Sequence, residues 1–166
     1  MPKEPELKEV LHILRKEPYV SAIGKLREMG VLHKHVIQTE LGEWVAYKLF
    51  GGQRMGSAHP VYDLVTPSGK TVKARTHYKE EMRTAPWSAV GQKHADIYII
   101  FLLKEDVGLE KALGGTRQEL QASGALRLER KHGPRLHWTM MPELTPEKAK
   151  ELGAADVTAL QQWKSH

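Results

Sequence analysis

The sequence contains no cysteine among its 166 residues. This absence excludes a disulfide framework, a thiol nucleophile and any metal site built on thiolate ligands. Long hydrophobic runs are also missing, since the longest, Ile97–Leu103, is far too short to span a bilayer. The first residues contain no apolar region typical of a signal peptide. We therefore expect a soluble, cytoplasmic protein without a membrane partner.

Hydrophobic residues make up 40% of the chain and charged residues 27%, which is ordinary for a globular protein and argues against disorder. A chain of this length fits a single domain, 1–166, that buries its own core. Lys and Arg outnumber Asp and Glu by 25 to 20, so the formal net charge is +5 and the pI is near 9.4. This balance favours polyanionic partners such as nucleic acids, although the same charge also serves solubility.

Helical patterns dominate the first fifty residues. A stripe with spacings of three and four residues ends before Pro18, and its members are Leu7, Val10, Leu11 and Leu14. A second short helix is predicted over 21–29, with Gly30 closing it. Thr39 is expected to cap a third helix, which ends at Gly51-Gly52. The core face of that third helix consists of Leu41, Val45 and Leu49.

The middle of the chain has the pattern of strands. A strand over 61–65, a turn over 66–69 and a returning strand over 70–77 are predicted to form a hairpin. Alternation divides the returning strand into two faces, with Val72, Ala74 and Thr76 on one and Lys73, Arg75 and His77 on the other. The apolar run over 95–103 favours a central strand covered on both faces.

The last third offers fewer patterns. Thr116-Arg117-Gln118-Glu119 has the form of a capping box, and Gly124 is a suitable end for its helix. Strands are predicted over 125–130 and 136–140. Thr145-Pro146 opens a short helix, and Asp156 is expected to cap a final one that reaches Trp163. We divide the chain into a helical segment (1–38), a central part (39–103) and C-terminal strands and helices (104–166).

A specific set of residues lies on the central elements. These are Gly42-Glu43 on the helix, Tyr62-Asp63-Leu64-Val65 on the first strand, Ser68-Gly69-Lys70 in the turn and Val72-Lys73-Ala74-Arg75-Thr76 on the second strand. Their order resembles the restriction-endonuclease-like, or PD-(D/E)XK, nuclease superfamily over 39–103. The resemblance implies an α/β fold with a mixed central sheet of about five strands flanked by helices.

The resemblance also implies an active site. In this superfamily carboxylates hold Mg²⁺, which activates water, while a lysine positions the nucleophile. By position, Asp63 matches the metal-binding aspartate and Glu43 the helix glutamate. Lys73 and Arg75 occupy the places of the glutamate and the lysine in the Glu-x-Lys motif. All four are candidate catalytic residues, with Asp63 and Glu43 as candidate metal ligands and Mg²⁺ as the cofactor if the chain is active.

The two replacements change the chemistry that we expect. The ammonium group of Lys73, placed beside the two acids, would occupy the position of the divalent ion. Arg75 stays protonated, so it can clamp a phosphate but cannot act as a base. The leading hypothesis is therefore a catalytically degenerate nuclease-like protein that binds DNA, or RNA. The candidate contact residues are Lys70, Lys73, Arg75 and Lys93, and a homodimer is an additional expectation.

Two other functions remain open from the sequence. One is an active Mg²⁺-dependent endonuclease with a rearranged site, in which Glu40, Gln92 or Lys93 takes over a role. The other is a protein-interaction module that retains only the fold and exposes an apolar patch on its C-terminal helices. Asp63 and Glu43 also have simpler, structural interpretations. Asp63 could form an ion pair with Lys73 or Arg75, and Glu43 could be a carboxylate in the first turn of its helix. Asp96, at the start of an apolar strand, is expected to be structural.

Overall fold

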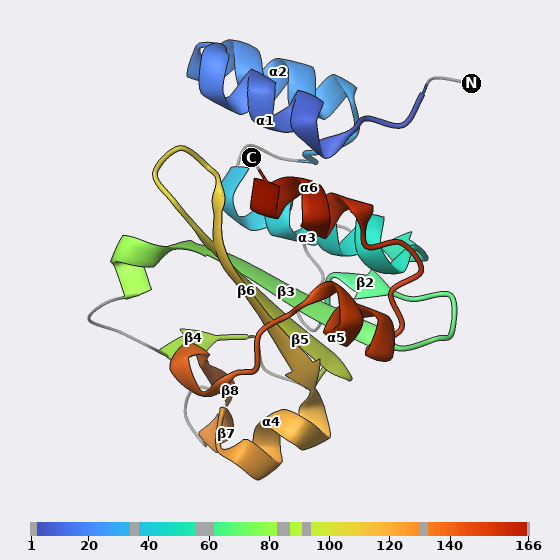
Figure 1. Cartoon of the computed structure of the whole chain (residues 1–166), viewed down its shortest axis with the longest axis vertical. Coiled ribbons are helices and arrows are strands. Elements are labelled where there is room, and N and C mark those ends of the chain that lie inside the picture. The colour runs from blue at the N-terminus through green and yellow to red at the C-terminus, as the bar shows by residue number, and fades with distance from the viewer. Residues whose placement is uncertain are drawn as a thin grey trace.

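The computed structural model describes residues 3–33, 37–55, 62–82, 87–90, 94–129 and 133–165. They form a mixed α/β fold in which helices flank a five-stranded mixed sheet, and a second sheet of three strands lies beside it (Figure 1). No helix in these ranges is both long enough and apolar enough to cross a membrane.

The N-terminal segment is a pair of helices, α1 (Leu7–Lys16) and α2 (Tyr19–Glu28), which lies at the top of Figure 1. The predicted stripe of α1 is confirmed, since Leu7, Val10 and Leu11 are buried. Pro18 separates the two helices and immediately precedes α2, which therefore starts earlier than predicted. Gly30 follows α2 with a left-handed backbone, φ 74°, as its predicted role as a helix stop requires.

The third helix, α3, extends over Ile37–Phe50. Thr39 lies inside it, so the prediction that Thr39 caps this helix was wrong. The hydrophobic pattern before Thr39 did not reveal the extra turn. The predicted core residues Leu41, Val45 and Leu49 are all buried. Gly51 and Gly52 follow the helix with φ of 69° and 88°, as expected for its end.

The main sheet has the order β1-β2-β3-β5-β6. Its strands are β1 (Gln53–Arg54), β2 (Leu64–Val65), β3 (Thr71–Tyr78), β5 (Ile97–Leu103) and β6 (Leu109–Thr116). Strand β2 pairs antiparallel with both β1 and β3, β3 and β5 are parallel, and β6 returns antiparallel to β5. Every residue of β5 is buried, so the predicted central strand is confirmed. Strands β1 and β6 were not predicted.

The predicted hairpin is present in part. Gly69, with φ 84°, donates its N–H to the carbonyl oxygen of Thr66 at 2.9 Å, which closes the expected turn between β2 and β3. Strand β2 is shorter than predicted, and Val61, where the prediction began, lies outside the described residues.

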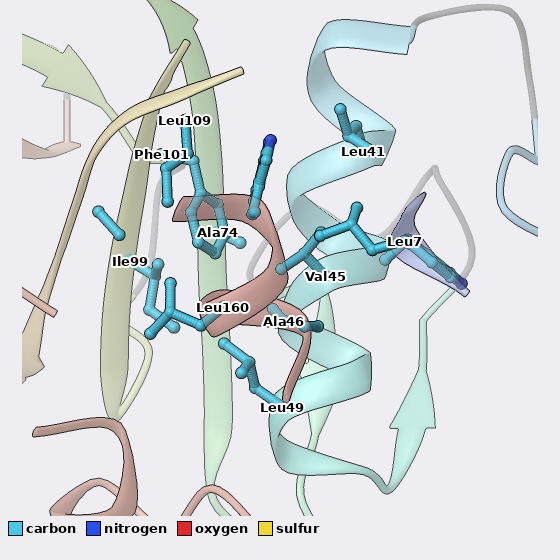
Figure 2. Packing of buried hydrophobic residues seen from close by; sticks show 14 of the residues in the cluster. Leu7, Leu41, Val45, Ala46, Leu49, Ala74, Ile99, Phe101, Leu109 and Leu160 are labelled. Atoms are coloured by element: carbon cyan, nitrogen blue, oxygen red, sulfur yellow. The ribbon is translucent and has the colours of Figure 1, made fainter. Parts of the chain in front are cut away.

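One face of the main sheet is covered by α3 and by the C-terminal helix α6 (Thr158–Ser165). Figure 2 shows Ala74, Ile99 and Phe101 of the sheet in one apolar cluster with Val45, Ala46 and Leu49 of α3 and Leu160 of α6. Helix and sheet approach closely at Gly42, where a Cβ atom would collide with Oγ1 of Thr76. The contact between α3 and β3 therefore requires glycine at this position.

The opposite face carries a second apolar cluster that includes Tyr98, Ile100 and Leu102 of β5. It is covered by the three-stranded antiparallel sheet, ordered β4 (Trp87–Ala89), β8 (Gly133–His137) and β7 (Leu126–Glu129). A short 3₁₀ helix, η1 (Lys79–Met82), follows β3. The strand predicted over 136–140 was misplaced, since β8 ends at His137 and Trp138–Met140 forms a second 3₁₀ helix, η2.

The predicted helix caps of the C-terminal part are confirmed. Thr116 and Glu119 form a capping box at the start of α4 (Arg117–Ser123), and Gly124 ends this helix with φ 80°. Thr145 caps α5 (Pro146–Glu151), since its Oγ1 accepts the N–H of Lys148 at 3.0 Å. Asp156 accepts the N–H of Thr158, the first residue of α6, at 2.9 Å.

Candidate functional site

Asp63 lies immediately before β2, with its backbone bonded to both neighbouring segments of the sheet. Its N–H donates to the carbonyl oxygen of Val72, and its own carbonyl oxygen accepts the N–H of Met55, both at 2.9 Å. The side chain is only 8% exposed. Its Oδ2 accepts the N–H of Ala74 at 2.8 Å. The sheet therefore fixes both the backbone and the carboxylate of Asp63.

The second oxygen of Asp63 forms an ion pair with Lys73. Nζ of Lys73 lies 3.2 Å from Oδ1 of Asp63, and Lys73 is 5% exposed. The simpler role considered for Asp63, pairing with Lys73, is thus present in the structure. Removing one partner of such a buried pair leaves the other charge without compensation, so each residue depends on the other.

Glu43 projects from α3 toward the same carboxylate. Burial, the charge of Asp63 and a hydrogen bond to the Asp63 side chain together raise the pKa of Glu43 to about 8, with burial as the largest cause. Glu43 is in the second turn of α3, so its role as a first-turn carboxylate does not apply. The structure brings three of the four candidate catalytic residues together as a row of interacting side chains, because Asp63 interacts with both Glu43 and Lys73.

Arg54 of β1 joins this group and was missed by the sequence analysis. Its Nη1 and Nη2 donate to the carbonyl oxygens of Gly30 and Val31 at 3.1 and 3.2 Å. Burial lowers the pKa of Arg54, while the charges of Glu43 and Glu40 oppose that shift. Glu40 is itself 3% exposed and accepts the N–H of His33 at 2.9 Å. A strand of two residues has no periodicity, so no sequence signal pointed to Arg54.

Arg75 lies on the same face of β3 as Lys73 but is not part of the row. Lys73, Arg75 and His77 are aligned with Tyr98, Ile100 and Leu102 of β5, which belong to the cluster under the second sheet. Arg75 is half-buried, and its Nε is one of three buried polar atoms with no hydrogen-bond partner in the described part of the chain. Nε2 of His77 lies 2.9 Å from Oγ of Ser88 in β4.

The other residues named from the sequence lie apart from this row or outside the described structure. Lys70 is exposed at the end of the β2–β3 turn. Lys93 and Gln92 lie outside the described residues. Asp96 is exposed, and its Oδ2 accepts both the N–H and the hydroxyl of Thr71, at 2.9 and 3.1 Å, in agreement with a structural role. Large exposed apolar side chains occur at Tyr19, Val20, Leu128 and Met140 in the described ranges, and none of these belongs to the C-terminal helices.

A divalent ion does not suit this donor set. Mg²⁺ requires several oxygen ligands in near-octahedral geometry. Here Asp63 already holds the ammonium group of Lys73 and the N–H of Ala74, and burial favours the protonated form of Glu43. Within the ranges that the structure describes, no three His, Asp or Glu side chains are grouped to hold an ion. The residues present therefore do not fit the metal that the resemblance implies.

No protein-family model matches the sequence, and no curated protein matches it significantly.

Proposed function

We propose that this protein binds nucleic acid through phosphate contacts, on a nuclease-like fold in which a lysine has replaced the catalytic metal. The observation that carries the proposal is the buried pair of Lys73 and Asp63, because Asp63 is the residue to which the resemblance assigns the divalent ion. This pair supports a site that keeps its architecture but lacks the means to activate water.

The order of elements supports the nuclease-like part of the proposal. Helix α3 is followed by the antiparallel strands β1, β2 and β3 and then by the parallel strand β5. Asp63 enters the sheet next to β3, which carries Lys73 and Arg75, and Glu43 reaches it from α3. Helix, aspartate, turn and basic strand thus meet in space in the combination on which the resemblance rests.

Arg75 and Lys70 supply the phosphate contacts in this proposal. Arg75 is half-buried, so part of its side chain stays accessible, and a guanidinium can hold two phosphate oxygens at once. Lys70 is exposed in the turn, immediately before the first residue of β3. Lys73 is turned inward to Asp63, so we assign it the neutralisation of that carboxylate rather than a direct phosphate contact.

The test is fluorescence anisotropy with labelled duplex DNA and RNA, titrated between about 50 and 200 mM salt. We expect dissociation constants of about 1–100 µM that weaken steeply as salt rises, because counterions are released on binding. Arg75→Ala should weaken binding and reduce the salt slope by about one. The matched control is Arg15→Ala, which removes the same charge from α1 beside Asp106 and should leave the slope unchanged.

Two results would contradict the proposal. Binding that is absent, or that ignores salt, would remove the nucleic-acid partner and favour a protein-interaction module. Nicking of supercoiled DNA with Mg²⁺ or Mn²⁺ that disappears in Asp63→Asn would show an active endonuclease and refute the loss of catalysis.

A further inference from the structure

A pocket of about 360 Å³ includes in its lining Arg54, whose charge interacts with those of Glu43 and Asp63. It is bounded by the end of α2, by α3 and by β1, and residues of the N-terminal stretch before α1 contribute to its rim. Its lining includes the side chains of His33, Trp44, Tyr47, Gln53 and Arg54. This volume falls within the range of small-ligand pockets.

Aromatic side chains form one wall of the pocket. Trp44 and Tyr47 are three residues apart on α3, so they lie on neighbouring turns of one helix face. Trp44 is 2% exposed, and Nζ of Lys48 lies 5.7 Å from the centre of its ring. Tyr47 is only half-buried. The wall therefore has a fixed base in Trp44 and an accessible ring in Tyr47, an arrangement suited to stacking a flat unsaturated group.

The charges around the pocket disfavour a phosphate. The guanidinium of Arg54 is held by the carbonyl oxygens of Gly30 and Val31, and the charge of Glu40 opposes its own. An anion entering here would meet Glu40, and Glu4 in the pocket lining, as well as the arginine. A neutral ring would instead find a guanidinium plane, the Gln53 amide and the imidazole of His33 at its edges.

We propose that this pocket accepts the base of an unpaired nucleotide of the bound nucleic acid. The inference rests on the proposed function, and Glu43 links this pocket to the pair of Asp63 and Lys73, because it interacts both with Asp63 and with Arg54. Phosphates contact Arg75 and Lys70, while one base leaves its neighbours and stacks on Tyr47. The protein thus prefers single-stranded or locally unpaired nucleic acid to a perfect duplex.

The probe is a short single-stranded oligonucleotide that carries 2-aminopurine, whose fluorescence is quenched by stacking. We expect quenching on binding to the unaltered protein. Tyr47→Leu should lose the quenching and weaken single-strand binding about tenfold, because one base–aromatic stack is lost. Tyr47→Phe, which keeps the ring, should behave like the unaltered protein. Gln53→Ala, at an exposed position, should weaken single-strand binding by a smaller factor.

Duplex binding and thermal unfolding of each variant complete the test. Duplex affinity should stay the same in all three variants, since the pocket takes no paired base. Unchanged quenching in Tyr47→Leu, or equal losses for duplex and single strand in a folded Tyr47→Leu, would overturn the base pocket while leaving the proposed function intact. If neither form of nucleic acid binds the unaltered protein, the proposed function itself fails.

Discussion

The two faces of strand β3 share one backbone but carry side chains of different chemistry, apolar for the most part on one face and basic on the other. Val72, Ala74 and Thr76 point toward α3, where the first two join the apolar cluster that includes Phe101. Lys73, Arg75 and His77 point the other way, where charge and hydrogen bonding determine their positions. One strand therefore contributes to the core with one set of residues and to the candidate site with the other. Because the side chains alternate, either set can change without altering the hydrogen bonds of the strand.

This difference predicts different responses to mutation. Apolar contacts respond to lost volume and are nearly indifferent to pH, since no group titrates in them. The buried charges respond to the loss of a partner and to protonation. The following four variants separate these behaviours, and their expected effects on the free energy of unfolding decrease from first to last.

Phe101→Ala should have the largest effect. Phe101 is fully buried, and its ring centre lies 5.1 Å from that of Trp163. We expect a loss of about 4 kcal/mol in the free energy of unfolding, measured in guanidinium chloride, with similar values at pH 5 and pH 8. A strong dependence of this loss on pH would mean that the two faces of the sheet are energetically coupled.

Lys73→Met should cost about 3 kcal/mol, because the Asp63 carboxylate would stay buried without its cation. Adding Asp63→Asn should recover a large part of that loss, which denaturant unfolding of both variants will measure. The control is Lys79→Met, whose ion pair with Glu110 is shorter, at 2.6 Å, but more exposed. That change should cost less than about 1 kcal/mol. Equal losses for the two lysines would contradict a special role for burial.

Glu43→Gln should change how stability depends on pH. Because the folded-state pKa of Glu43 is raised to about 8 by burial and by Asp63, the native protein holds a proton that the unfolded chain releases above about pH 4.5. This contribution is present below pH 4.5 and is lost as pH rises through 8. Between pH 4.5 and pH 8 the free energy of unfolding of the unaltered protein should therefore fall by about 2 kcal/mol relative to that of Glu43→Gln. This figure is reduced because Glu43 is partly exposed to solvent. Parallel stability curves for the two proteins over pH 4–9 would refute the raised pKa.

Arg75→Met should have the smallest effect on stability, less than about 1 kcal/mol by thermal or chemical unfolding. The reason is that Nε has no partner to lose in the described structure, and methionine keeps much of the apolar stem. Lys73 is two positions away on the same face, so the pair of variants compares a buried ion pair with a cation that we propose to contact a phosphate. A loss as large as that of Lys73→Met would assign Arg75 a structural role instead.

Several elements could be predicted because their signals are local. The stripe of α1, the Thr116–Glu119 capping box and the Thr145-Pro146 helix start each depend on residues within one or two turns. Strand β1 was missed because it has two residues, and β6 because Gly114 and Gly115 interrupt its apolar pattern. Thr39 was misplaced because a good capping residue can equally lie inside a helix.

The candidate site also combines features that the sequence predicts with features that depend on tertiary packing. By itself, the sequence determined the alternation along β3, and with it the presence of a basic face next to an aspartate-bearing strand. Only the tertiary structure decided that Lys73 is buried against Asp63, that Glu43 meets the same carboxylate and that Arg54 joins the group from β1. The physical reason is that periodicity fixes the direction of a side chain relative to its own strand, whereas its partner, burial and protonation depend on elements that packing brings together.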